Sequence, residues 1–124
     1  MGTETRGDVL VVDDDATMVG VLVQALEEEG YRVRAAVGEM AVRLARAERP
    51  GLVLLGLVRP GTGGGEVSWR LRRDRRTAGV PLVALVVAEA GRAAAVAGLV
   101  DAVVATPFDL DTLYALVARW LRAA

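Results

Sequence analysis

Short apolar runs alternate with amphipathic stretches along the whole chain. The runs suited to strands lie at residues 8–12, 31–35, 52–57, 81–87 and 102–105. The run at 52–57 is almost continuously apolar and has a Pro-Gly pair on either side, which is typical of a buried parallel strand. The run at 31–35 alternates polar and apolar residues, which indicates a strand at the edge of a sheet.

The stretches between these runs have the apolar spacing of helices. We expect helices at about 16–29, at about 39–49, from about 66 onward, at about 89–98, and after Asp109. Gly30 and Pro50 stand where the first two should end, and Asp109 is a good N-cap for the last. This alternation predicts an α/β fold: a doubly wound five-stranded parallel sheet in the order 2-1-3-4-5 with five helices, forming one domain over residues 1–124.

Composition narrows the classes of function. The 124 residues are 53% hydrophobic, enough to build the core of one ordinary domain. The absence of cysteine and histidine excludes disulfides, thiolate metal sites and histidine bases. A formal net charge of -1 gives no overall attraction to nucleic acid or anionic lipid, and no apolar run approaches the roughly 18 residues that span a bilayer. We therefore expect a cytoplasmic protein that binds neither nucleic acid nor membrane.

Two carboxylates and a glycine should meet at the carboxyl edge of the predicted sheet. In the order 2-1-3-4-5 the winding reverses between the first and third strands, and ligands of such folds bind at that point. Asp13 and Asp14 follow the first strand, and Gly56 lies near the end of the third. Glycine is unusual inside a buried strand, because it packs nothing and adds backbone entropy to the unfolded chain. Position 56 therefore needs an explanation of its own.

Several stretches together resemble a known family. They are VLVVDDD at 9–15, LEEEGYRV at 26–33, PGLVLLGL at 50–57, LRRDRRTAGVPLVAL at 71–85 and TPFDL at 106–110. Over nearly its whole length the chain resembles the bacterial response-regulator receiver domain, which is CheY-like and flavodoxin-like in fold. The resemblance implies a signalling protein of a two-component system or phosphorelay.

The resemblance also implies a phosphorylation site, three positions of which are changed in this chain. Receivers carry a phosphoacceptor aspartate where this chain has Gly56, a hydroxyl where it has Val86 and a lysine where it has Thr106. Losing one acid together with one lysine leaves the formal charge of the site unchanged, which limits new repulsion. We interpret the chain as a degenerate receiver, or pseudo-receiver, with no catalytic residue and no enzymatic activity.

The two remaining acids have two interpretations. Asp13 and Asp14 either cap the start of the first helix or stay solvated, or else they hold a metal ion. Two carboxylates are an incomplete site for Mg²⁺, which prefers six oxygen ligands in octahedral geometry. We therefore expect no cofactor, and Mg²⁺ binding only in about the millimolar range or weaker.

These residues leave several functions open. The first is a phosphorylation-independent interaction module for a protein partner of a signalling pathway, and the second is a small-ligand sensor that uses the vacated corner. A third is a receiver phosphorylated at Asp13 or Asp14. The spacing of Asp13, Asp15 and Thr17 also resembles the DxDxT motif of haloacid-dehalogenase-type phosphatases, but the basic residue and later acidic pair of that class are not placed here.

The resemblance places the partner-binding surface on the helix at 89–98, the strand at 102–105 and the last helix. Small side chains around Ala94 would let another backbone approach closely, while Arg92, Tyr114 and Arg119 would supply polar and aromatic contacts. Val103 stands where receivers carry an aromatic residue that responds to phosphorylation, so we expect this face to stay in one state. It would bind a partner, or a second copy in a homodimer, constitutively. The alternative is that the alanines reflect helix propensity alone.

An arginine cluster and two tryptophans invite functional interpretations that we do not adopt from sequence. The cluster surrounds the expected end of the third helix and consists of Arg70, Arg72, Arg73, Arg75 and Arg76. Arginine there complements the helix macrodipole, so we expect a solvated helix end and no phosphate site. Trp69 and Trp120 lie in amphipathic helices, where we expect core packing. The glycines at 61–65 are expected to form a flexible turn.

Overall fold

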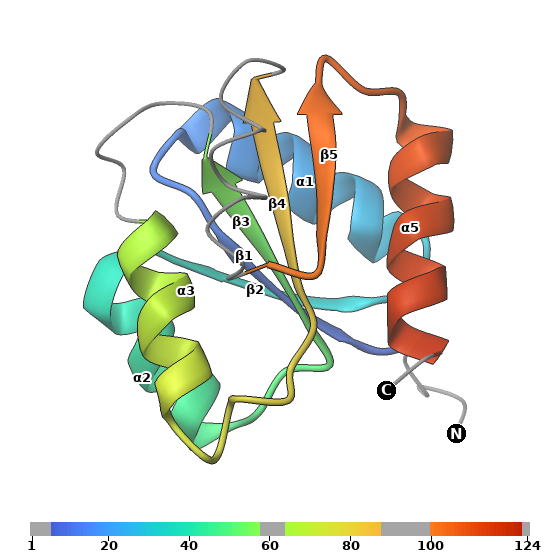
Figure 1. Ribbon diagram of the computed structural model, residues 1–124. Helices are drawn as coiled ribbons and strands as arrows, with labels where there is room; N and C mark the ends of the chain where they lie inside the picture. Colours follow the sequence, from blue (N-terminus) through green and yellow to red (C-terminus); the bar gives the residue numbers. More distant parts are fainter. Residues whose placement is uncertain (1–5, 58–63, 88–99, 123–124) are drawn as a thin grey trace.

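The computed structural model describes residues 6–57, 64–87 and 100–122. Its centre is a five-stranded sheet made of β1 (Asp8–Val12), β2 (Arg32–Ala36), β3 (Leu52–Leu57), β4 (Leu82–Val87) and β5 (Ala102–Thr106). Neighbouring strands are parallel and follow the order β2-β1-β3-β4-β5 (Figure 1). The predicted sheet and strand order are confirmed, and β2 lies at the edge, as its alternating pattern indicated.

Helices cover both faces of this sheet. The part of the chain that the structure describes contains α1 (Ala16–Glu28), α2 (Gly38–Ala47), α3 (Gly64–Arg73) and α5 (Leu110–Arg122). α1 and α5 lie on one face, and α2 and α3 on the other (Figure 1). The helix expected at 89–98 falls outside the described residues, as does the turn expected at 61–63, whereas Gly64 and Gly65 begin α3. No helix among those described is long and apolar enough to cross a membrane.

Alternate residues of the central strands supply two separate cores. In β1, Val9 and Val11 pack with apolar side chains of α1 and α5, among them Leu22. Leu10 and Val12 point to the opposite face and pack with side chains of α2 and α3. Burying one such side chain stabilises the fold by about 1.5–3 kcal/mol. The continuous apolar runs are therefore explained, because these strands are covered on both sides.

Polar side chains set the ends of two helices. Asp15 is the N-cap of α1, and its carboxylate accepts a hydrogen bond of 3.0 Å from the N–H of Thr17. Gly30 follows α1 with a φ of 95°, a left-handed conformation that favours glycine, so the predicted stop is confirmed. Asp109 accepts a hydrogen bond of 2.7 Å from the N–H of Thr112 at the start of α5. That bond holds the pKa of Asp109 below its ordinary value.

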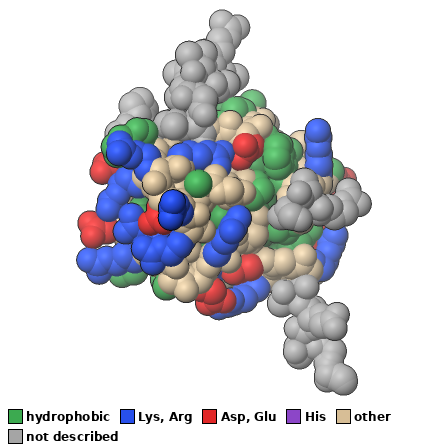
Figure 2. Space-filling view, turned by 60° about the horizontal axis from the view of Figure 1, so that its bottom comes forward, with side chains coloured by type: hydrophobic (Ala, Val, Ile, Leu, Met, Phe, Trp, Pro, Cys, Tyr) green, Lys and Arg blue, Asp and Glu red, His purple; other side chains and the backbone are tan. Residues whose placement is uncertain are grey.

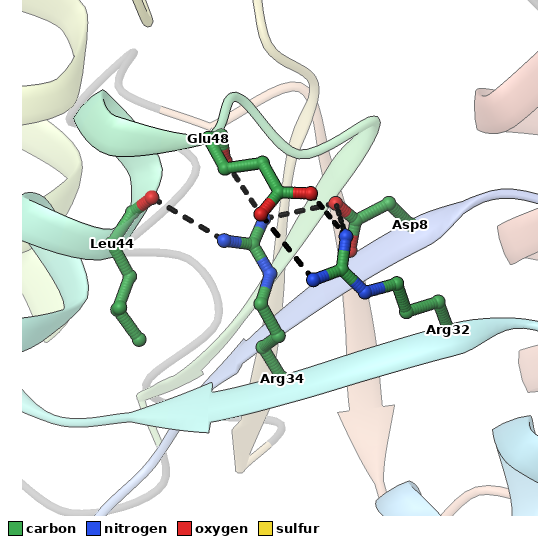
Figure 3. A network of polar contacts seen from close by, with 5 residues as sticks. All are labelled: Asp8, Arg32, Arg34, Leu44 and Glu48. Carbon is green, nitrogen blue, oxygen red and sulfur yellow. Dashed lines mark hydrogen bonds and ion pairs between the residues drawn. The ribbon is translucent and has the colours of Figure 1, made fainter.

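A network of charged side chains fastens the edge strand β2 at the amino end of the sheet (Figure 3). Arg34 donates to the Asp8 carboxylate at 2.9 Å. It also donates to the main-chain carbonyls of Glu48 at 2.8 Å and Leu44 at 3.3 Å. Arg32 pairs with the Glu48 carboxylate, and this hydrogen bond is the main reason that the pKa of Glu48 is lowered. The two arginines thus join β2 to the end of α2, where basic side chains complement the helix macrodipole.

Another arginine, Arg72 of α3, holds the chain reversal between α3 and β4. Its guanidinium donates to the carbonyl of Ala78 at 3.0 Å and to that of Val80 at 2.9 Å. It also donates to the Asp101 carboxylate at 2.7 Å, which in turn accepts from the N–H of Leu82 at 2.8 Å. Arg72 therefore connects α3 to the starts of β4 and β5, which gives it a structural task that its neighbours in the arginine cluster do not share.

Candidate functional site

The carboxyl ends of β1 and β3 lie side by side, as the fold class requires. In the sheet register Val12 of β1 pairs with Leu55 of β3, so the next residues along the two strands, Asp13 and Gly56, are neighbours. The sequence-predicted corner of Asp13, Asp14 and Gly56 is therefore brought together at the edge toward which the strand arrows point in Figure 1. This is the edge at which α/β sheets of this class bind ligands.

Asp13 fills the space beside Gly56. One carboxylate oxygen, Oδ1, accepts a hydrogen bond of 2.9 Å from the N–H of Asp15, which holds the side chain inward. A Cβ atom at position 56 would lie 3.0 Å from the Cβ of Asp13 and would overlap its carboxylate. Glycine at 56 is thus explained by a close approach that any larger residue would disturb.

The N-cap of α1 is Asp15, whereas the sequence interpretation considered Asp13 and Asp14 for capping or solvation. Asp13 caps the Asp15 N–H, and Asp15 is itself the N-cap of α1, while Asp14 is exposed. Over residues 6–57, 64–87 and 100–122, no group of three acidic side chains is arranged to hold a metal ion. Because Mg²⁺ requires several oxygen ligands around one point, the described residues do not fit a complete Mg²⁺ site.

The two other changed positions lie at the same edge. Val86 is fully buried in β4 and stands opposite Leu57 of β3 and Ala105 of β5. The resemblance implies a hydroxyl-bearing residue at position 86. This chain has the buried, apolar side chain of Val86 there. Thr106 ends β5 opposite Val87, so the backbone at 106 also reaches this edge.

The surface expected to dock partners is only partly brought together. Arg92 and Ala94 lie outside the described residues. Val103 is half-buried and lines a hollow of about 370 Å³ with residues of the following loop and α5, such as Leu116. Arg119 is exposed on α5.

Tyr114 lies on a different side of α5 from this hollow. It packs against the core shared by α1 and α5. Burial, together with the carboxylates of Glu29 and Glu28 at the end of α1, raises its pKa. Tyr114 does not line the hollow beside Val103, because the helical repeat turns position 114 toward α1. Its expected part in partner docking stays a prediction.

Two features escaped the sequence interpretation. Trp69 was expected in the core but is 48% exposed on α3, whereas Trp120 does pack against a core cluster. Arg34, with a side chain only 15% exposed, contacts both the start of β1 and the end of α2. Its position in an alternating edge strand was visible, but its partners are 10 to 26 residues away along the chain, so no local pattern identified them.

Comparison with known proteins gives a consistent result. The model of the response regulator receiver domain family matches residues 9–118. The DNA-binding response regulator MtrA of Mycolicibacterium paratuberculosis is 38% identical over 122 residues, which cover 94% of this chain and 52% of MtrA. Protein PilH of Pseudomonas aeruginosa is 37% identical over 76 residues, which cover 60% of this chain and 63% of PilH. The matches thus span about half to two thirds of these relatives' lengths.

The fold has close counterparts among solved structures. A response regulator from Chloroflexus aurantiacus superimposes with a TM-score of 0.84 at 28% identity, over 94% of this chain and 98% of that one. The receiver domain of a sensor histidine kinase from Pseudomonas aeruginosa, solved with a magnesium ion in its active site cleft, gives a TM-score of 0.82 at 26% identity, over 93% and 97% of the two chains.

Proposed function

Because the chain belongs to the response regulator receiver domain family, we propose that it serves two-component signalling as a receiver that recognises its partner without phosphorylation of an aspartate. The observation that carries this proposal is the contact between Asp13 and Gly56. The Asp13 carboxylate lies where the side chain of an acceptor at position 56 would begin. This contact supports the proposal, because a side chain at position 56 would compete with the Asp13 carboxylate for the same space.

The chemistry of phosphoryl transfer supports the proposal. An enzyme or receiver that accepts a phosphoryl group needs a nucleophile, a divalent cation and groups that neutralise the charge on the transferring oxygens. Position 56 has no side chain, position 86 has no hydroxyl and position 106 has no cation. The described acids do not form a three-carboxylate metal cluster. Each missing group contributes to the same step, so their joint loss should reduce the rate severely.

The same changes favour a surface with one conformation. In receivers the strand-four hydroxyl and an aromatic residue of strand five transmit phosphorylation to the docking surface, as the resemblance implies. Here these positions are Val86, which is buried among apolar neighbours, and Val103. A ligand or modification shifts a conformational equilibrium only by the difference in its interaction with the two states. Without those two groups, partner binding should be constitutive.

Mass spectrometry tests the proposal directly. After incubation with acetyl phosphate and Mg²⁺, the intact protein should show no added phosphoryl mass. Partner capture should be the same with and without beryllofluoride, which mimics an aspartyl phosphate. A phosphoryl group mapped to Asp13 or Asp14 would overturn the proposal and identify one of those carboxylates as a substitute acceptor.

A further inference from the structure

A groove lined mainly by arginine lies at the end of α3, far from the Asp13 corner. It encloses about 620 Å³, and its walls come from α3, from the turn that follows it and from Arg46 of α2. We call it the arginine groove; the residues that line it are Arg46, Trp69, Arg70, Arg73, Asp74, Arg75 and Arg76. Blue side chains gather on this side of the molecule in Figure 2. Helices run opposite to the strands in this fold, so the groove lies at the amino edge of the sheet (Figure 1).

The groove has a surplus of positive charge that its own acid does not offset. Five arginines face one aspartate, a formal excess of four positive charges. Asp74 is already occupied, since its carboxylate lies 2.5 Å from Nε of Arg46 and 3.5 Å from Nε of Arg76. Within the described part of the chain, no acidic side chain lies within ion-pair distance of Arg70 or Arg75.

Helix-end electrostatics does not account for so many arginines. The C-terminus of a helix carries the equivalent of about half a negative charge, which one or two basic side chains offset. Arg72 already places one positive charge in the last turn of α3, and its guanidinium donates to the carbonyls of Ala78 and Val80 in the connection to β4. The arginines that remain are in excess of what α3 needs.

Trp69 gives the groove an aromatic wall. Its side chain is 48% exposed, and the guanidinium of Arg73 stacks over its ring at 4.5 Å from the centroid. Tryptophan and arginine are the residues that contribute most to binding at protein interfaces. An exposed tryptophan beside arginines that have no acidic partner among the described residues suits a surface that a partner covers.

We propose that the arginine groove binds a short acidic segment of a protein partner. The arginine forks suit carboxylates, and Trp69 suits an aliphatic or aromatic side chain between them. The charge outside the groove favours a short acidic segment as its ligand over a long polyanion such as a nucleic acid. The whole chain has a net charge of -1, so four positive charges in the groove leave a net of five negative charges elsewhere. A nucleic acid extending past the groove would meet repulsion, whereas a short acidic segment would not.

The test uses the full chain with Trp120→Phe, which leaves Trp69 as its one tryptophan. Trp120 packs in the core on the opposite face of the sheet, so this change leaves the groove intact. The probe is a fluorescein-labelled peptide of repeated Glu-Glu-Leu triplets, followed by anisotropy and by Trp69 emission. Saturable binding that shifts Trp69 emission and weakens with added salt is expected.

Matched variants locate the site. The double change Arg70→Gln and Arg75→Gln should weaken peptide binding by roughly tenfold, as expected when two charge contacts at the surface are removed. Arg6→Gln, which removes an exposed arginine that pairs with Glu29 beyond the end of α1, should leave binding unchanged. Circular dichroism melts confirm that each variant is folded.

Three results would overturn the inference. They are the absence of saturable binding, equal affinity in the double variant, and tighter binding of a single-stranded oligonucleotide or of a Lys-Lys-Leu peptide than of the acidic one. None of these readouts depends on phosphorylation. A negative result for peptide binding would therefore leave the proposed loss of phosphoryl transfer untouched, and the reverse also holds.

Discussion

The side chain of Asp13 and the missing side chain of Gly56 are complementary: the carboxylate of one occupies the space that the other leaves. The N–H of Asp15 holds this carboxylate in place from the opposite side. The packing at this corner therefore favours glycine at position 56. A residue restored at position 56 must displace Asp13 as well as supply its own chemistry.

Replacing Gly56 by alanine should destabilise the fold even though alanine is the smallest substitution. The added methyl would overlap the Asp13 carboxylate, and overpacking of this kind costs about 1–3 kcal/mol. Urea unfolding should show a smaller cost for Gly56→Ala in the background Asp13→Ala, because the obstructing carboxylate is gone. Equal costs in the two backgrounds would mean that the Asp13 contact does not decide the residue at 56.

Restoring the acceptor alone should give little phosphorylation. Gly56→Asp places a carboxylate at the corner, but the hydroxyl and the cation remain absent, so labelling by acetyl phosphate should be slow at best. The triple variant with Val86→Thr and Thr106→Lys should label faster. Rates are measured by intact mass against time, and equal rates for the single and triple variants would contradict the roles assigned to positions 86 and 106.

Mg²⁺ should bind weakly to the natural sequence. Asp13 already accepts the Asp15 N–H, so few free oxygens remain for a cation that prefers six. Calorimetric titration should give a dissociation constant of about a millimolar or higher. If a tight site appeared and Asp13→Asn abolished it, the capping interpretation of Asp13 would have to be abandoned.

Removal of Arg34 should cost much more stability than removal of an exposed arginine nearby. Arg34→Met removes the nearest cation from the largely buried Asp8 carboxylate and the arginine donor from the carbonyl of Glu48, whereas the carbonyl of Leu44 keeps the N–H of Glu48. We expect a loss of about 1–3 kcal/mol. Arg43 is a matched control, since it is exposed on α2 and pairs only with exposed Glu39 among the interactions described. Arg43→Met should change stability by less than about 0.5 kcal/mol. Similar losses for both would remove the special role of Arg34.

Acid should weaken the fold partly through Glu48. Its pKa in the folded state is lowered, chiefly by the hydrogen bond from Arg32, so its contribution to stability is present above the ordinary pKa. That contribution is lost as pH falls below about 4.5 and through the lowered value. Melting temperatures of wild type and Glu48→Gln should therefore converge as the pH approaches 3, whereas a constant difference from pH 7 to pH 3 would argue against the pairing.

The sheet was predictable because local signals and fold-level rules agreed. Five apolar runs, Gly30 and Asp109 located most elements within one or two residues, and alternation of strands and helices fixed the strand order. The meeting of Asp13 with Gly56 followed from the topology. The occupation of that space by a carboxylate did not, because a side-chain rotamer depends on a hydrogen bond two residues away.

Surface positions were less predictable for a related reason. Amphipathic spacing placed Trp69 in a helix but did not show that its ring lies outside the core. Tyr114 was grouped with Val103 because both belong to the same pair of elements, yet the faces of α5 separate them. Which flank of a helix meets which neighbour is set by tertiary packing, and a single sequence carries little information on it.

Arg72 fixes the turn after α3 through the carbonyls of Ala78 and Val80 and the carboxylate of Asp101. Among the contacts described, Arg70 and Arg75 take no part in holding this turn. We therefore expect single substitutions of Arg70 or Arg75 to leave the fold intact, so that what the proposed groove recognises can change separately from stability. After a gene duplication, the two encoded proteins could then come to bind different partners while every variant along the way remains folded.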